Sequence, residues 1–180
     1  IKITAPAHGL VWRKDPARII DLYLKWSTYS KSKAENKVTL MFGSMYGNTS
    51  RAAEALAEGL RASGVEYETF NVSQTHISYI LPSILTSQGI AIGAPTYEGS
   101  LFPGIAQALL MAEFKRMFNK EVVYFGSFGW GGGAQRYLGA QLERLKWTLT
   151  SALEFAGQPN SENLKGLSDL GKEFGEKISS

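Results

Sequence analysis

The sequence of 180 residues contains no cysteine. That absence excludes disulfides, thiolate zinc sites, iron–sulfur clusters and a cysteine nucleophile. Any redox chemistry must therefore come from a bound organic cofactor or from metals held by nitrogen and oxygen ligands. The sequence also lacks a signal peptide and a run of about eighteen apolar residues, the length that a membrane span needs. We therefore expect a cytoplasmic protein with no membrane partner.

An excess of charge of one sign is also missing. Lys and Arg number 19 against 16 Asp and Glu, which gives a formal net charge of +3 and a pI of about 9.1. The basic residues are scattered among acidic ones, which is typical of a solvated surface and argues against a nucleic-acid partner. A hydrophobic fraction of 44% can supply one good core, so the length predicts one domain with an appendage.

From Lys37 onward, short apolar runs alternate with amphipathic stretches. The apolar runs predict strands over residues 37–42, 65–70, 89–94, 121–126 and 149–155. The amphipathic stretches predict helices over residues 50–62, 77–85, 105–118, 134–147 and 162–178, and Pro82 predicts a kink or a displaced start in the second of them. Apolar strands joined by helical crossovers indicate an α/β fold: a five-stranded parallel, doubly wound sheet with helices on both faces.

The first 36 residues do not follow this alternation. Residues 1–4 are expected to form a strand end, residues 15–26 an amphipathic helix with Pro16 in its first turn, and residues 28–36 a polar linker. The chain opens at Ile1, within the expected strand and without Met, so we expect it to be a piece of a longer protein.

The loop from Gly43 to Thr49 joins the first expected strand to its helix. The hydroxyls of Ser44 and Thr49, the carboxamide of Asn48 and the free N–H groups at a helix N-terminus suit a phosphate dianion. The loop has no Lys and does not match G-x-G-x-x-G, so it is neither a nucleoside-triphosphate loop nor a dinucleotide loop. An ordinary strand–turn–helix connection with Thr49 as N-cap would explain the same residues equally well.

Two further loops follow the third and fourth expected strands, and a doubly wound fold brings all three loops to one edge of the sheet. Residues 94–99 include Tyr97, and residues 127–133 include Phe128 and Trp130. A lone aromatic residue at a strand end is more often a capping or core residue. Two aromatic loops beside a phosphate loop, however, suit a cofactor with one phosphate and one flat ring system.

These motifs resemble a known family. Residues 44–49, Ser-Met-Tyr-Gly-Asn-Thr, look like the flavodoxin phosphate loop S/T-x-x-G-x-T, and residues 37–180 resemble a flavodoxin, which implies the strand order 2-1-3-4-5. Together with Ala-Pro-Thr-Tyr at 94–97 and Gly-Ser-Phe-Gly-Trp-Gly-Gly-Gly at 126–133, they look like the flavin domain of flavodiiron proteins (A-type flavoproteins). Residues 5–13, Ala-Pro-Ala-His-Gly-Leu-Val-Trp-Arg, are similar to the end of that family's metallo-β-lactamase-like domain. The resemblance therefore implies two parts: residues 1–36 as the remnant of that domain plus a linker, and residues 37–180 as a flavodoxin-like FMN-binding domain.

The resemblance implies that FMN places its phosphate in the loop 44–49 and its isoalloxazine ring between the loops 95–99 and 127–132. The family often has Asn where this chain has Glu98, so we expect a carboxylate near the flavin, where it should disfavour an anionic reduced flavin. The implied cofactor-binding residues are Ser44, Met45, Tyr46, Gly47, Asn48, Thr49, Pro95, Thr96, Tyr97, Glu98, Gly99, Ser127, Phe128, Gly129, Trp130, Gly131 and Gly132.

The sequence contains two histidines, in different contexts. His8 lies in the Pro-x-His-Gly context of the family's terminal diiron ligand, although an isolated histidine is usually structural or exposed. One imidazole cannot hold two irons, and the other ligands would come from a domain that this chain lacks. His8 is therefore a candidate metal ligand in the full-length parent alone, and no occupied diiron site is expected here. His76, which follows Thr75, is expected at the start of a helix.

By the same resemblance, the parent is an oxidoreductase in which FMN takes electrons from a redox donor and passes them to a diiron centre. That centre reduces dioxygen to water or nitric oxide to nitrous oxide. This chain would supply the electron-transfer half, with no catalytic residue of its own. The implied donor is a rubredoxin-like protein or a fused flavin reductase, and the parent would form a homodimer or tetramer.

Two alternatives belong to other functional classes. A stand-alone flavin reductase would oxidise NAD(P)H and reduce a quinone, but nothing in the sequence marks a nicotinamide site. A flavin-free interaction module of the same fold, such as a receiver domain, would need an acidic cluster at the strand ends. Those positions hold Ser44, Pro95 and Ser127.

Overall fold

Residues 1–29 and 33–180 are described by the structure, which is a computed structural model. The strands are β1 (Glu35–Phe42), β2 (Glu66–Asn71), β3 (Ser87–Gly93), β4 (Thr96–Tyr97), β5 (Ser100–Leu101), β6 (Glu121–Phe128) and β7 (Thr148–Ala156). The helices are α1 (Arg18–Thr28), α2 (Asn48–Ser63), α3 (Ile77–Thr86), α4 (Pro103–Phe114), α5 (Ala134–Leu145) and α6 (Ser161–Ser179).

Five strands form one parallel sheet in the order β2-β1-β3-β6-β7. Counted along the chain without the short β4 and β5, this is the order 2-1-3-4-5, so the predicted topology is confirmed. The winding reverses between β1 and β3, because the chain runs outward from β1 to β2 and then returns to the other side of β1. Ligands of doubly wound sheets bind at the carboxyl ends of the strands at such a reversal.

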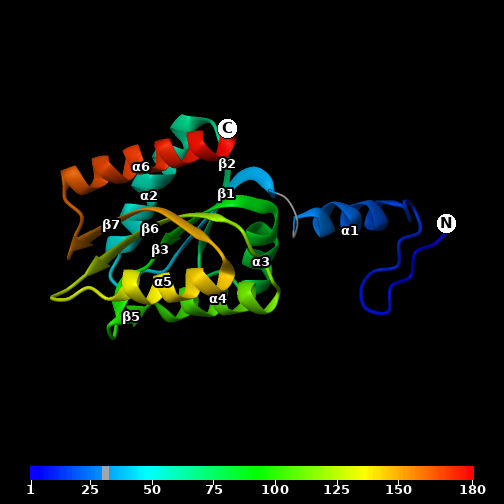
Figure 1. Cartoon of the computed structure of the whole chain (residues 1–180), viewed down its shortest axis with the longest axis horizontal. Helices are drawn as coiled ribbons and strands as arrows, with labels where there is room; N and C mark the ends of the chain where they lie inside the picture. Colours follow the sequence, from blue (N-terminus) through cyan, green and yellow to red (C-terminus); the bar gives the residue numbers. More distant parts are fainter. Residues whose placement is uncertain (30–32) are drawn as a thin grey trace.

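Helices cover both faces of the sheet, as predicted: α2 and α6 lie on one face, and α3, α4 and α5 lie on the other (Figure 1). Successive residues of a strand point to opposite faces, so each central strand supplies both cores. Met41, Ile92 and Tyr124 belong to the core beneath α3, α4 and α5, whereas their neighbours Leu40 and Phe125 belong to the core beneath α2 and α6. All five side chains are completely or almost completely buried.

The helices α2 and α6 approach each other closely through glycines. A Cβ atom on Gly59 would collide with the carbonyl oxygen of Ser168, and one on Gly171 would collide with the carbonyl oxygen of Leu56. Only a residue without a side chain allows the two backbones to come this near. The contact fixes α2, and with it the loop that precedes α2, against the rest of the domain.

Several predicted boundaries need correction. The helix predicted over 105–118 ends at Phe114, and the one predicted over 134–147 ends at Leu145. Arg116 and Lys146 have left-handed backbone conformations with φ of 56° and 54°, which terminate a helix even without glycine. Pro82 lies inside α3 and did not displace its start, which is the predicted Ile77.

The N-terminal segment also differs from expectation. The strand predicted over residues 1–4 is wrong, because the described structure there has only a single bridge between Thr4 and Trp12. The helix predicted from residue 15 begins at Arg18, so Pro16 precedes it and Asp15 accepts a hydrogen bond from the Arg18 N–H (3.2 Å). The predicted linker 28–36 is shorter, because its last two residues already belong to β1; residues 30–32 lie outside the described ranges.

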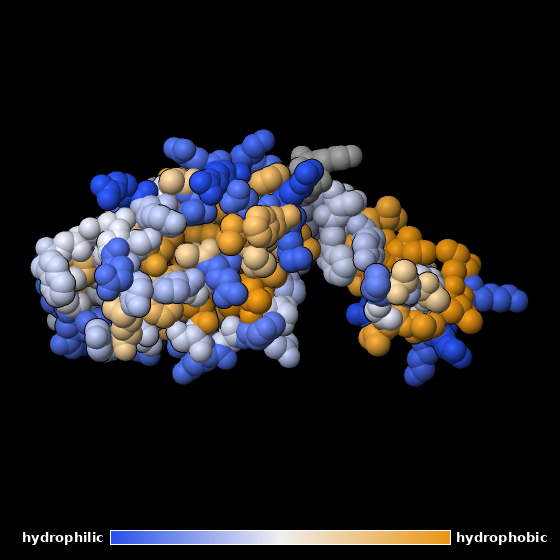
Figure 2. All heavy atoms as spheres, turned by 90° about the horizontal axis from the view of Figure 1, so that it is seen from below, coloured by the Kyte–Doolittle hydropathy of each residue, from blue (hydrophilic) through white to orange (hydrophobic). Residues whose placement is uncertain are grey.

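Helix α1 extends away from the sheet (Figure 1) and buries none of its residues. It is joined to the domain by Glu35 at the start of β1, whose carboxylate accepts a hydrogen bond from Tyr29 Oη (2.6 Å) and pairs with Lys25 Nζ (2.8 Å). Apolar side chains remain exposed on the segment (Figure 2), among them Leu10, Tyr23 and Leu24. None of the helices in the described ranges is long and apolar enough to cross a membrane.

Candidate functional site

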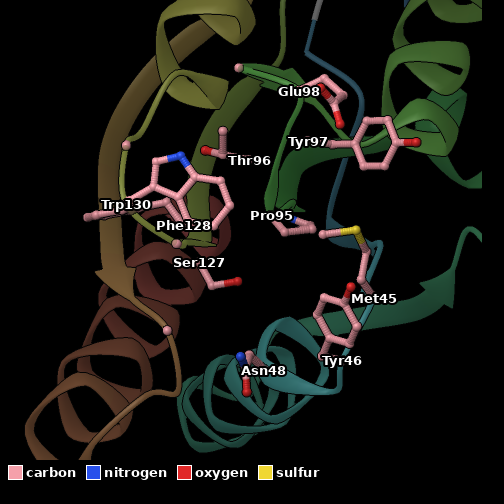
Figure 3. A pocket seen from close by; sticks show the side chains of 14 residues that line it. Met45, Tyr46, Asn48, Pro95, Thr96, Tyr97, Glu98, Ser127, Phe128 and Trp130 are labelled. Atoms are coloured by element: carbon pink, nitrogen blue, oxygen red, sulfur yellow. The ribbon is translucent and has the colours of Figure 1, made fainter.

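The loops that follow β1, β3 and β6 meet at the carboxyl edge of the sheet and enclose a cleft (Figure 3). Its volume is about 560 Å³, which is within the usual range for a small-molecule site. The residues that line it are Met45, Tyr46, Asn48, Pro95, Thr96, Tyr97, Glu98, Gly99, Ser127, Phe128, Gly129, Trp130, Gly131 and Gly157. A narrow extension is lined by Ser44, Met45, Tyr46, Asn48, Thr49, Pro95 and Ser127.

The narrow extension lies at the N-terminus of α2. Gly47 caps the helix with a left-handed backbone (φ 87°) and has no side chain to cover the first turn. In the described part of the chain, the N–H groups of Asn48 and Thr49 have no hydrogen-bond partner, and no acidic residue occupies the first turn. The free donors and the positive end of the helix dipole together favour an anion at this position.

Serine and threonine hydroxyls complete this cradle. Ser44 Oγ accepts hydrogen bonds from the N–H groups of Gly47 (3.1 Å) and Ser50 (3.4 Å), which holds the loop in its tight turn. Thr49 Oγ1 lies 3.4 Å from Ser127 Oγ, and both side chains are buried. Two hydroxyl groups that share one weak hydrogen bond can each turn toward an anion without leaving a buried partner unsatisfied.

Aromatic side chains flank the wider part of the cleft. Trp130 is fully exposed, and Tyr46 is 87% exposed. Tyr97 is held against Phe102 in an edge-to-face contact with 6.4 Å between ring centroids. Exposed aromatic residues at the wall of a polar cleft are suited to pack on a planar ring, which would cover their apolar faces.

A short hairpin, absent from the prediction, shapes one wall of the cleft. The strands β4 and β5 pair Tyr97 with Ser100, so Glu98 and Gly99 form a two-residue turn with φ of 49° and 71°. Positive φ at both positions is characteristic of a type I′ turn. The hairpin is held from the other side by the glycine-rich loop, because a Cβ atom on Gly133 would lie 2.5 Å from the carbonyl oxygen of Gly99.

A hydrogen-bonded brace lies behind the cleft walls. Tyr124 Oη lies 3.0 Å from the carbonyl oxygen of Ala94, directly after β3, and 3.2 Å from Glu154 Oε1 on β7. Burial raises the pKa of Tyr124, and the negative charge of Glu154 raises it further. The phenol therefore stays protonated and able to donate, which ties the loop after β3 to the outer strand.

Most of the predicted cofactor residues meet in this one place. Of the 17, all except Gly47 and Gly132 line the cleft or its extension. Gly47 acts through its backbone conformation, and Gly132 belongs to the loop without lining the cleft. Gly157, directly after β7, was missed because only the loops after β1, β3 and β6 were considered. The brace between Tyr124 and Glu154 was missed because it depends on strand register.

The two histidines lie outside the cleft. His76 is the N-cap of α3 and its ring accepts a hydrogen bond from the Ser78 N–H (3.3 Å), so its predicted place at a helix start is confirmed. His8 lies on the exposed N-terminal segment. Within the described ranges no three His, Asp or Glu side chains are grouped so that they could hold a metal ion. The role of His8 as a ligand in a longer protein stays a prediction.

Comparisons with known proteins agree with this geometry. Residues 40–171 match the flavodoxin family. The chain is 33% identical over 180 residues to a nitric oxide reductase of Moorella thermoacetica, covering 99% of this chain and 44% of the relative. It is 34% identical to the anaerobic nitric oxide reductase flavorubredoxin of Pectobacterium carotovorum, covering 97% of this chain and 34% of the relative. The chain thus spans less than half the length of these curated relatives.

A solved structure shows the same arrangement. The flavodiiron protein of Giardia intestinalis superposes with a TM-score of 0.87 at 27% identity, covering 99% of this chain and 44% of that one. The match extends over the segment before residue 40 as well as over the five-stranded domain.

Proposed function

The chain belongs to the flavodoxin family and its homologues are flavodiiron proteins, and from this we propose that it binds FMN in the cleft and transfers electrons through it. The observation that carries the proposal is the anion cradle at the N-terminus of α2, which opens into a cleft flanked by aromatic residues. An anion site joined to a site for a flat ring is what a mononucleotide of this shape requires.

The residues of the cleft fit FMN chemically. Free N–H groups of Asn48 and Thr49, together with the hydroxyls of Ser44, Thr49 and Ser127, would hold the phosphate. Phe128 and Trp130 on one side and Tyr97 on the other would contact the ring. Bound FMN would supply the redox chemistry, while the protein binds the cofactor, orients it and limits its contact with water.

The activity of the whole protein is a wider proposal. The relatives are nitric oxide reductases, and we propose that the longer parent of this chain reduces nitric oxide or dioxygen at a diiron centre outside residues 1–180. The residues before β1 would comprise the end of the metallo-β-lactamase-like domain that carries that centre and the linker that follows it, with His8 as one ligand. Helix α1 supports this assignment, because none of its residues is buried and apolar side chains such as Tyr23 and Leu24 are exposed.

A redox donor is the partner that the homologues support. One relative is a flavorubredoxin, which supports a rubredoxin-like donor for this chain. A fused flavin reductase is the other candidate. We also propose that the parent forms a homodimer or tetramer.

The two alternatives are not favoured. A quinone reductase that uses NAD(P)H would gain from basic side chains for the dinucleotide phosphates, and none of the described residues that line the cleft is Lys or Arg. A flavin-free module would not explain the anion cradle or the exposed Trp130 at the wall of the cleft.

The test is a titration of the purified protein with FMN and, separately, with riboflavin, which lacks the phosphate. We expect FMN to bind and quench its fluorescence, and riboflavin to bind at least about tenfold more weakly, as the loss of charge-assisted hydrogen bonds to the phosphate predicts. Equal affinity for the two would show that the cradle holds no phosphate. No binding of either ligand would reject the proposed function.

A further inference from the structure

One charged side chain stands out among the described residues that line the cleft. Among the described residues that line the cleft and its extension, Glu98 is the only one with a charged side chain. Figure 3 shows Glu98 at the opposite end of the cleft from Asn48, which belongs to the anion cradle. None of the ion pairs in the described ranges includes Glu98. The cleft therefore favours an anion at one end and presents a carboxylate without a cationic partner at the other.

Glu98 occupies a position that its residue type does not favour. It is the first central residue of the type I′ turn between β4 and β5, with φ of 49°. Asn-Gly is the preferred pair for such a turn, because a short polar side chain tolerates the left-handed conformation. A glutamate there adds backbone strain and gives the turn nothing in return. The carboxylate is therefore better explained by the cleft than by the fold.

Contacts on both sides restrain the hairpin that carries Glu98. The N–H of Ala134 lies 3.5 Å from Thr96 Oγ1, and Gly133 packs directly on Gly99. These contacts fix the hairpin against the start of α5 on one side, while the edge-to-face contact of Tyr97 with Phe102 fixes it on the other. The backbone of Glu98 is thus held at the rim of the cleft, where its side chain is exposed.

We infer that Glu98 makes the cleft bind the reduced cofactor more weakly than the oxidised one, and thereby lowers the reduction potential of the bound flavin. This inference rests on the proposed function. A neutral ring that takes up two electrons and one proton gains one negative charge. The carboxylate at the rim opposes that charge and leaves the neutral ring almost unaffected, while its exposure lets water screen part of the repulsion. A difference in affinity between two redox states is, by thermodynamic linkage, a shift in potential.

The experiment compares the full chain with Glu98→Gln, which keeps the size of the side chain and removes its charge. Both proteins are loaded with FMN and titrated anaerobically with dithionite against a reference dye. We expect the affinity for the reduced relative to the oxidised cofactor to rise about tenfold, which raises the two-electron midpoint potential by about 30 mV. A potential that stays unchanged or falls overturns the inference.

Two further variants separate charge from turn geometry. Glu98→Asn removes the charge and relieves the turn, whereas Glu98→Asp keeps the charge and also suits the left-handed conformation. If the charge lowers the potential, Glu98→Asn has the same raised potential as Glu98→Gln, and Glu98→Asp keeps a potential near that of the wild type. If relief of backbone strain changes the potential instead, Glu98→Asn and Glu98→Asp have the same altered potential, and the inference is rejected. Glu58→Gln, at an exposed position of α2, controls for a change in net charge and should leave the potential unaltered.

The outcomes also distinguish the two proposals. Failure of the wild-type protein to bind FMN rejects the proposed function. Normal binding of FMN by all variants, with identical potentials, rejects the role of Glu98 alone.

Discussion

The hydroxyl oxygens of Thr49 and Ser127 lie 3.4 Å apart, although 78 residues separate them in the sequence. Thr49 lies in the first turn of α2 and Ser127 lies near the end of β6. The pair closes the narrow end of the cleft, where both side chains are buried. Two segments that are distant in sequence therefore supply the hydroxyls of one anion cradle.

Replacement of Thr49 by Val should weaken FMN binding. The variant keeps nearly the same volume and loses the hydroxyl, which should cost about 1–3 kcal/mol because the phosphate is charged. Fluorescence titration gives the dissociation constant, and the affinity for riboflavin serves as the internal control, since it should not change. An unaltered FMN affinity would mean that the phosphate lies elsewhere.

The sequence predicted the five main strands because buried parallel strands leave short, almost continuous apolar runs, whereas the strand order followed from the resemblance to flavodoxins. The whole of β3, for example, is buried. It also predicted that the loop over residues 44–49 and both aromatic loops meet, since strand ends in a doubly wound sheet share one edge. Periodicity thus predicted the strands and helices, and the loop motifs predicted the position of the site.

Other features could not be read in this way. The hairpin of β4 and β5 has strands of two residues, too short to show a period. The ends of α4 and α5 depend on Arg116 and Lys146 in left-handed conformations, which residue type does not predict. The brace of Tyr124 with Glu154 depends on the register of β6 against β7, which only the folded structure specifies.

Replacement of Tyr124 by Phe should destabilise the domain. It leaves the carbonyl of Ala94 and the carboxylate of Glu154 without their shared donor, which should lower the free energy of unfolding by about 1–3 kcal/mol. Urea denaturation measures the loss. Tyr137→Phe, at a half-exposed position on α5, is the matched control and should change little. Equal stability of the Tyr124 variant and wild type would contradict the structural role of the brace.

Lys120 should make the stability depend on pH. Its Nζ donates to the carbonyl of Leu85 (3.0 Å), and burial lowers its pKa to about 8 from an ordinary value of 10.5. Between these two values the unfolded chain binds more protons than the folded one, so this residue makes the free energy of unfolding rise with pH across that window. Below pH 8 the buried charge is present in full, and with it the destabilisation.

Lys120→Met should therefore raise the free energy of unfolding at neutral pH by about 1–3 kcal/mol and flatten its rise between pH 8 and 10.5. Denaturation at a series of pH values measures both effects. Lys172→Met, on the exposed face of α6, is the control and should keep the wild-type slope. The prediction is wrong if the two variants show the same dependence.

Replacement of two helical glycines by alanine should change the stability of the domain in opposite directions. Gly59→Ala would force α2 away from the Ser168 backbone of α6 and should lower stability by about 1–3 kcal/mol or more. Gly139→Ala in α5 meets no atom within 4 Å and should raise stability by about 0.5–1 kcal/mol through the lower entropy of the unfolded chain. Thermal denaturation of the pair distinguishes close helix packing from helix propensity, because propensity alone would stabilise both variants.

The cleft collects residues from the ends of β1, β3, β6 and β7, so whatever occupies it fastens four strands together. Occupancy at a hundredfold excess over the dissociation constant adds about 2.7 kcal/mol to the stability of the folded state. Local unfolding of any one of these strand ends would then allow the ligand to dissociate. Binding of the ligand should slow amide hydrogen exchange along the whole carboxyl edge of the sheet. The lifetime of the folded domain in a cell would accordingly follow the supply of its ligand.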